Sequence, residues 1–178
     1  MTPFVDRMVR AAKLDVHLYE EVEADKSALG QATGVVVLSS VASGVGLMGA
    51  GGFEGIVVGT LGALVGWYIW AFLTYFIGTK LLPEPQTHAD YGELLRTIGF
   101  SSSPGLIRVL GIIPALAPFV FLIAGIWMLV AMVTAVRQAL DYHSTLRAVG
   151  VCVIGWLVQA VIVGLVLAMV GGLPSTEP

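Results

Sequence analysis

The sequence has few charged residues for its length. Of its 178 residues only 12% are charged, whereas a soluble domain carries about 25%, and its mean hydropathy is +0.90. A domain of this size cannot bury so much apolar surface in its own core, so lipid is the expected solvent. The net charge of −3 leaves no basic surface for nucleic acid, which excludes that class of partner.

Cysteines and catalytic motifs are scarce as well. The single Cys152 cannot form an internal disulfide and stands in an apolar run, where we interpret it as a membrane-buried hydrophobic residue. The sequence contains no H-E-x-x-H, G-x-S-x-G, G-K-[ST] or paired-cysteine motif. We therefore predict that the protein is not an enzyme and binds no cofactor.

Histidines and carboxylates occur together in two polar segments. One segment holds His88, Asp90 and Glu93, and the other holds Asp141 and His143. If both segments lie at the cytosolic face, these side chains could converge on a metal ion, which needs three or four ligands. Solvated loop residues are the favoured interpretation, so we predict no metal site.

Ionisable residues are missing from the apolar segments. No Asp, Glu, Lys or His falls in the predicted hydrocarbon region; Arg108 stands near an end, and Gln159 is the clearest polar side chain inside. Ion-coupled transporters, proton relays and intramembrane hydrolases use ionisable groups at depth. The pattern argues against transport and catalysis, although a passive channel stays compatible with it. We expect Gln159 to hydrogen-bond to a neighbouring helix.

Long apolar segments are what the sequence does contain. They cover 32–50, 55–78, 105–136 and 148–170, and the first holds 19 residues, about 28 Å as a helix, which matches the hydrocarbon thickness. The 29 residues before it are charged with both signs, and no convincing cleavage site follows them. We expect the first segment to stay attached as a span.

The segment 105–136 is too long for one upright span, since its 32 residues measure about 48 Å as a helix. A proline inside a helix removes a backbone hydrogen bond and kinks it. We predict a break that divides the segment into a short helix, 105–116, and a full span, 118–136. The prolines that set these helix boundaries are Pro104, Pro114 and Pro118.

The basic residues favour a hairpin in this segment. With a hairpin, all nine Lys and Arg residues fall on one side of the membrane, as the positive-inside rule prefers. One uninterrupted span would instead put Arg137 and Arg147 opposite Lys80 and Arg96. The amino terminus is then cytosolic and the carboxyl terminus outside, in what we expect to be the cytoplasmic membrane of a bacterium. Whether 105–116 crosses fully or re-enters does not alter this orientation.

The predicted fold is an all-α polytopic membrane protein with five membrane-inserted helices and two cytosolic interfacial amphipathic helices. The third membrane helix is short and interrupted by proline. The interfacial helices cover 4–26, within an amino-terminal segment 1–29, and 90–99. A solvated helix leading into the first span is the alternative for 4–26. The membrane domain is 30–173, with spans at 32–50, 55–78, 105–116, 118–136 and 148–170, and a tail at 174–178.

Basic and apolar side chains at the two interfacial helices, and one arginine after them, are predicted to meet the headgroup layer. These residues are Arg7, Arg10, Lys13, Leu94, Leu95, Arg96 and Arg108.

Small residues recur on the first two spans. The predicted helix-packing glycines are Gly51, Gly55, Gly59, Gly62 and Gly66, opposite a similar face with Ser39, Ser40, Ser43, Gly44 and Gly46. Such series let helices approach closely in lipid. We predict that the first and second spans pack together, with a homodimer seam as the alternative.

Aromatic residues gather at the end of the second span. They are Trp67, Tyr68, Trp70, Phe72, Tyr75 and Phe76. We interpret them as an interfacial belt that also packs against 90–99, with ligand binding as the less favoured alternative.

Four stretches resemble the Yip (Ypt-interacting protein) family of five-span membrane proteins, in its prokaryotic branch. They are FVDRMVRAAKLDVHLYEEVEAD, WAFLTYFIGTKLL, YGELLRTIGFSSSPGLI and IWMLVAMVTAVRQALDYHSTLRAVG, in family order. The resemblance implies a cytosolic amino terminus and five helices. In eukaryotes the family is linked to vesicle trafficking, Rab GTPase binding and membrane shaping. The Asp-Leu-Tyr-Gly-Pro motif of those members is replaced here by Leu18-Tyr19-Glu20-Glu21.

The leading hypothesis is a non-enzymatic membrane protein that organises lipid or partner proteins, as a scaffold or membrane-shaping protein. Two interfacial helices, a glycine packing face and the lack of buried charge favour it. A small transporter or channel is the alternative, because interrupted helices often frame transport sites. An accessory subunit of a larger membrane complex is a further alternative. The expected partners are the lipid bilayer and other membrane or cytosolic proteins.

Overall fold

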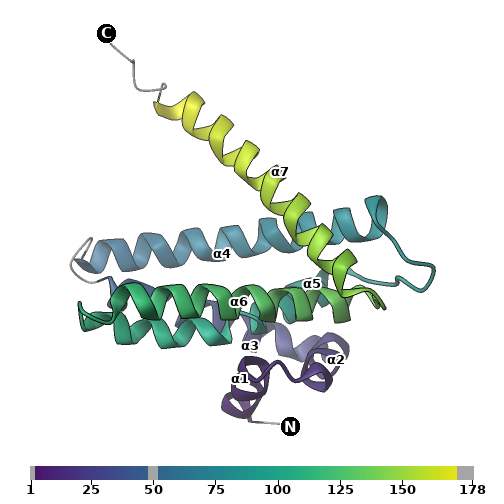
Figure 1. Ribbon diagram of the computed structural model, residues 1–178, viewed down its shortest axis with the longest axis horizontal. Helices are drawn as coiled ribbons and strands as arrows, with labels where there is room; N and C mark the ends of the chain where they lie inside the picture. Colours follow the sequence, from purple (N-terminus) through teal and green to yellow (C-terminus); the bar gives the residue numbers. More distant parts are fainter. Residues whose placement is uncertain (1–2, 48–51, 172–178) are drawn as a thin grey trace.

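A computed structural model describes residues 3–47 and 52–171 (Figure 1). All the regular structure within these residues is helical. In chain order the elements are α1 (Phe4–Ala12), α2 (Val16–Ala24), η1 (Lys26–Ala28), α3 (Leu29–Gly46), α4 (Gly52–Phe76), η2 (Ile77–Leu81), α5 (Tyr91–Phe100), η3 (Ser103–Ile112), α6 (Ala117–Ala139) and α7 (Thr145–Gly171). Gly51, the end of the predicted span 32–50 and the tail 174–178 lie outside the described residues.

Four of these helices are long and apolar enough to cross a membrane. They are Lys26–Gly46, Gly52–Leu81, Ala117–Ala139 and Thr145–Leu165. Their outer faces expose large apolar side chains, such as Leu61, Ile126 and Val161, which suits a lipid solvent rather than water. The four long spans of the sequence prediction are therefore present as helices, and the expected fifth is not among them.

The amino-terminal region contains two helices instead of the single predicted helix 4–26. Leu14 has a φ of 61°, in the left-handed region that ends a helix, and the Asp15 carboxylate accepts from the His17 N–H at 3.0 Å to begin α2. Arg10 pairs with Asp15 at 2.8 Å, and this hydrogen bond holds the pKa of the Asp15 carboxyl below its ordinary value. The corner folds α2 back onto α1.

Ion pairs hold this corner against the start of α3. Arg7 is buried, and its guanidinium donates to Glu21 at 2.9 Å, to Asp25 at 2.9 Å and to Gln31 at 3.0 Å. Charges with so little solvent need such partners, because an unpaired buried charge is costly. The prediction that Arg7 meets lipid headgroups is therefore wrong.

The helix predicted at 90–99 is present as α5, but it lies inside the protein instead of on the membrane surface. Asp90 and Glu93 form a reciprocal capping box at its start, and every residue from Leu94 to Phe100 is buried. The neighbours of α5 are α2, α3, α4 and α6. The interfacial placement of Leu94, Leu95 and Arg96 is therefore corrected: their apolar stripe faces other helices.

Arg96 joins α5 to the amino-terminal helices. It is 5% exposed; its Nε donates to the Val22 carbonyl oxygen at 2.9 Å, and an Nη donates to the Glu23 carbonyl oxygen. These carbonyls belong to the last turn of α2, where a helix has unsatisfied acceptors and a partial negative charge. One guanidinium thus closes α2 and fixes it to the membrane domain.

The aromatic cluster of α4 packs on α5, as predicted. The Trp67 indole N–H donates to the Leu95 carbonyl oxygen at 3.1 Å, and the Tyr91 hydroxyl donates to the Tyr68 carbonyl oxygen at 2.8 Å. The Phe72 and Tyr91 rings meet edge to face with centroids 6.2 Å apart. These contacts cross from α4 to α5, so they fix α5 to a membrane span.

The segment predicted as a third membrane helix, 105–116, lies mostly in a 3₁₀ helix, η3, instead of an α-helix. Pro104 stands in its first turn and Pro118 in the first turn of α6, where a missing N–H costs nothing. Pro114 lies between the two helices. Residues 113–116 belong to neither helix. The 3₁₀ geometry differs from the predicted α-helix, because its rise of about 2.0 Å per residue makes η3 longer than an α-helix of the same number of residues.

Close backbone approaches place the chain from α5 to η3 alongside α3. A Cβ added at Gly99 would lie 2.8 Å from the Ala32 Cβ, and one at Gly111 would lie 3.0 Å from the Gly46 carbonyl oxygen. Between these points a Cβ at Gly105 would overlap the Ser39 hydroxyl. The two segments therefore run parallel. η3 reaches the last residue of α3, and α6 then runs back toward the other end of the bundle (Figure 1).

The loop 82–90 is bound to the turn between α6 and α7. Gln86 donates to the Asp141 carbonyl oxygen at 2.9 Å, and Arg147 donates to the Pro83 carbonyl oxygen at 2.7 Å. The Tyr142 hydroxyl lies 2.7 Å from the Leu82 carbonyl oxygen, and burial raises its pKa to about 12. We call this end of the bundle, with α2, the loop and the turn, the polar end; the far end holds Gly46 and the start of α6.

The last helix, α7, leaves the bundle at an angle (Figure 1). Ala148, Val151 and Cys152 near its start are buried against the bundle, whereas Leu157 and Val161 are about two-thirds exposed at 63% and 62%. Within the described residues, α7 therefore packs on the bundle from its start to Trp156, whose ring centroid lies 6.5 Å from that of Trp70.

Replacing Gly46 by alanine tests the contact between α3 and η3. The added methyl would overlap the Arg108 carbonyl oxygen, and overpacking of this kind costs about 1–3 kcal/mol. Gly46→Ala should lower the midpoint of thermal unfolding in detergent, measured by circular dichroism. Gly62→Ala is the matched control, because a Cβ there meets nothing within 4 Å and alanine favours a helix by roughly 0.5–1 kcal/mol. Equal midpoints for the two variants would contradict the close approach.

Arg96→Met tests the link between α2 and α5. The change leaves the Val22 and Glu23 carbonyls without their donor, and a hydrogen bond from a charged group contributes about 1.5–3 kcal/mol. We expect faster tryptic cleavage after the exposed Lys13 and Lys26, because the amino-terminal helices are released from the bundle. Lys80, which is exposed in η2, is the internal reference site. Loss of protection at Lys80 to the same degree would indicate global unfolding and count against a local link.

Candidate functional site

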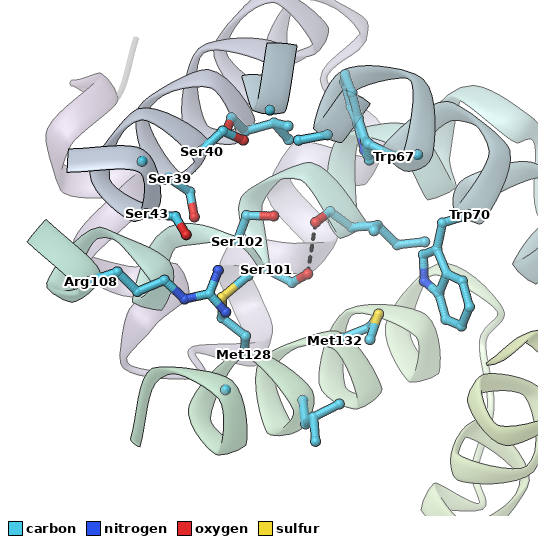
Figure 2. A pocket seen from close by; sticks show the side chains of 18 of the residues that line it. Ser39, Ser40, Ser43, Trp67, Trp70, Ser101, Ser102, Arg108, Met128 and Met132 are labelled. Atoms are coloured by element: carbon cyan, nitrogen blue, oxygen red, sulfur yellow. Dashed lines mark hydrogen bonds between the residues drawn. The ribbon is translucent and has the colours of Figure 1, made fainter. Parts of the chain in front are cut away.

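A cavity of about 710 Å³ lies among α3, α4, α5, η3, α6 and α7 (Figure 2). Sites for small molecules have volumes of roughly 300–1,000 Å³. The lining on α4 runs from Gly55 to Trp70, which is about 22 Å of helix. The cavity therefore follows most of a hydrocarbon core that is about 30 Å thick.

Small residues on α4 form one wall of the cavity. Gly55, Gly59 and Gly66 line it, and a Cβ added at any of them would meet nothing within 4 Å. Gly62 is equally open but is not part of the lining. α3 and α4 pack together, as predicted. The close approach is at Gly44, where an added Cβ would lie 2.8 Å from Ile56, and not at the described glycines of α4.

Serine hydroxyls form the opposite wall. Ser40 and Ser101 donate back to the Val36 and Ile98 carbonyl oxygens at 2.8 and 2.7 Å. Within the described residues, the hydroxyls of the other three serines of the lining make no hydrogen bond; these are Ser39, Ser43 and Ser102. This wall therefore offers hydrogen-bonding groups to whatever fills the cavity.

Arg108 extends from η3 into the cavity, and Figure 2 shows its guanidinium pointing toward Ser101 and Met128. Its Nε is buried without a hydrogen-bond partner in the described chain. The guanidinium carbon lies 5.8 Å from the centre of the Phe121 ring, a cation–π contact that offsets only part of the cost of removing the charge from water.

The depth of Arg108 differs from the prediction that it reaches the headgroups near the start of its helix. Its carbonyl oxygen is beside Gly46 at the far end of α3, and its side chain points back toward Ser101 and Ser102, inside the bundle (Figure 2). Arg108 is therefore an ionisable group inside the bundle, where the sequence led us to expect none. A charged residue inside a membrane domain marks a functional site by default.

Two further polar groups of the lining lack partners. The buried Trp70 indole N–H has no acceptor within the described residues, and Gln159 from α7 lines the same space. The expected hydrogen bond from Gln159 to a neighbouring helix is not made within the described chain. The cavity thus collects polar groups from helices that are far apart in the sequence.

The Yip1 domain family model matches residues 18–171. The chain belongs to the Yip family. No curated protein and no solved structure matches it. The matched range contains every residue that lines the cavity and leaves out α1. With its four long apolar helices, this Yip1-domain chain is an integral membrane protein in contact with the lipid bilayer.

A second cavity, also of about 710 Å³, lies at the polar end of the Yip1 domain. It brings Glu93 together with Asp141 and His143, which are residues of the two polar segments considered for a metal. Asp90 instead caps α5, and His88 is not part of the lining. In the part of the chain that the structure describes, no group of three or more His, Cys, Asp or Glu residues is arranged to hold a metal ion.

Glu23 lines this acidic cavity and has an unusual protonation equilibrium. Burial, together with the nearby carboxylates of Asp141 and Glu93, raises its pKa from an ordinary value near 4.5 to about 7. The folded protein therefore binds this proton more tightly than the unfolded chain does. The resulting stabilisation is fully present below about pH 4.5 and is lost as the pH rises through about 7.

Glu23→Gln should raise the midpoint of thermal unfolding at pH 8 and have a much smaller effect at pH 5. Glutamine is neutral at both values, so it removes the cost of a charged Glu23 only where that charge exists. Glu54→Gln, at the exposed start of α4, is the control for loss of one negative charge. A stabilisation by Glu23→Gln that is equal at the two pH values would contradict the raised pKa.

Proposed function

We propose that this Yip-family protein is non-enzymatic and organises membrane lipid by holding a lipid molecule in the cavity between α3, α4, α6 and α7. The observation that carries the proposal is a cavity whose lining joins Arg108, serines and glycines to apolar side chains of α3, α4, α6 and α7. Its length of about 22 Å along α4 suits an extended acyl chain, which would make dispersion contacts with the apolar part of the lining.

The walls of the cavity support entry from the side. Leu129 on α6 and Trp156 on α7 both line it, and they are 37% and 47% exposed. Both helices expose apolar side chains to the surrounding lipid, so an acyl chain would pass between surfaces of like polarity. A path through the polar end is less favoured, because buried residues of α5 close it.

The proposal includes an orientation with the polar end in the cytosol of a bacterium. Lys13, Lys80, Arg137 and Arg147 belong to that end or to the helices beside it, in keeping with the positive-inside rule. The carboxyl end of α7 is then outside. Arg108 no longer contributes to this argument, since it lies within the bundle. In this orientation the exposed Lys13 is free to meet headgroups or a protein partner.

A small transporter or channel is the second candidate function. Its support is η3, a non-α segment between prolines that carries Arg108 into a cavity, since interrupted helices frame many transport sites. Vesicles with the purified protein would then show flux of an anion, and Arg108→Gln would abolish it. Flux that the variant leaves unchanged would exclude this cavity as the route.

Filling the cavity tests the lipid-holding function. Gly59→Phe places a ring in the lining, whereas Gly62→Phe places the same ring on α4 outside it. We expect Gly59→Phe to reduce the lipid that co-purifies in mild detergent by severalfold and Gly62→Phe to leave it unchanged, as measured by native mass spectrometry. Equal lipid content in both variants and the unmodified protein would overturn the proposal.

A further inference from the structure

The polar groups that face the cavity have an excess of donors. Arg108 and Trp70 can only donate hydrogen bonds, and a buried nitrogen of each is without an acceptor in the described chain. The free hydroxyls of Ser39, Ser43 and Ser102 can donate too. A ligand that satisfies these groups must therefore be rich in acceptor oxygens.

The charge of the cavity is equally one-sided. Arg108 is its charged lining residue, and no Asp or Glu belongs to the lining that the structure describes. Elsewhere in the protein the buried arginines have internal partners: Arg7 pairs with carboxylates, and Arg96 donates to main-chain carbonyls. Arg108 is half-buried with a fully buried Nε, and it makes no ion pair within the described residues, so a bound anion would supply its counter-charge.

The surroundings of Arg108 are amphiphilic. Met128, Leu129 and Met132 on α6 line the cavity, and Figure 2 shows Met128 beside the guanidinium. One end of a ligand would meet donors, while the rest would lie against thioethers and aliphatic side chains. This pattern suits a molecule with an anionic group and a long apolar body.

We infer that Arg108 binds the phosphate group of an anionic phospholipid whose acyl chains occupy the rest of the cavity. The inference rests on the proposed lipid-holding function and adds the recognised group. A guanidinium fork matches two phosphate oxygens, and the serine hydroxyls supply further donors. A zwitterionic lipid would bring an ammonium group as well, for which the lining offers no carboxylate. An anionic lipid instead leaves the occupied cavity neutral.

The test is competition between lipids of opposite character. The full-length protein is placed in nanodiscs with equal amounts of phosphatidylglycerol and phosphatidylethanolamine, extracted in mild detergent, and its bound lipids are counted by native mass spectrometry. The unmodified protein should retain phosphatidylglycerol in excess. Arg108→Gln should lower the ratio of the two bound lipids about tenfold, which corresponds to about 1.4 kcal/mol.

Matched variants separate recognition from general charge and from folding. Lys80→Gln removes one exposed positive charge outside the cavity and should keep the ratio of the unmodified protein. Arg108→Lys keeps the charge without the planar fork and should keep most of the preference. If Arg108→Gln does not fold, Arg108→Met serves as the second charge-removing variant, because its side chain suits the neighbouring Phe121 and Met128.

The possible outcomes distinguish the role of Arg108 from the lipid-holding function itself. Lipid retained without preference, or a preference unchanged in Arg108→Gln, overturns the role of Arg108 and leaves the lipid-holding function standing. No retained lipid in the unmodified protein overturns both. A preference that millimolar inorganic phosphate abolishes would assign the site to a free anion and overturn the phospholipid assignment.

Discussion

The packing of α5 among its neighbours is the constraint on which the rest of the arrangement depends. α2, α3, α4 and α6 surround this amphipathic helix, and the Arg96 guanidinium ties it to the last carbonyls of α2. Since α5 leads directly into η3, the same packing sets the depth at which η3 begins.

That depth accounts for the cavity. With η3 running beside α3, the close approaches at Gly46, Gly105 and Gly111 use up one face of α3. The small residues of α4 then face a space that no helix of the described chain fills. The placement of η3 beside α3 thus produces both the close packing on α3 and the open space beside α4. Arg108 extends from η3 into this space.

Much of the fold follows from local rules, and the candidate site does not. Hydropathy identified the long spans, and helix length with Pro114 and Pro118 identified the break in the third segment. The stripe of Leu94 and Leu95 predicted an interfacial helix, because an apolar stripe looks the same whether lipid or protein covers it.

The partner of Arg96 is a pair of main-chain carbonyls more than 70 residues away, which no side-chain pattern encodes. The depth of Arg108 depends on η3 running beside α3, and a hydropathy profile treats the residue as one near a segment end. The sequence signal for the cavity was the pair Ser39 and Ser43, one helical turn apart. The same pair is equally typical of a helix-packing face.

The angle of α7 has a mechanical consequence. This helix of 27 residues is about 40 Å long, and the hydrogen bonds between the 82–90 loop and the α6–α7 turn fix it at its base. Gly155 also packs on Trp70, so the part of α7 from residue 156 to 171, about 24 Å long, forms an arm beyond these contacts. A rotation of about 10° displaces the end of this arm by about 4 Å. Trp156 and Gln159 lie at the start of this arm and line the cavity, so the tilt of one helix sets the width of the opening toward the bilayer.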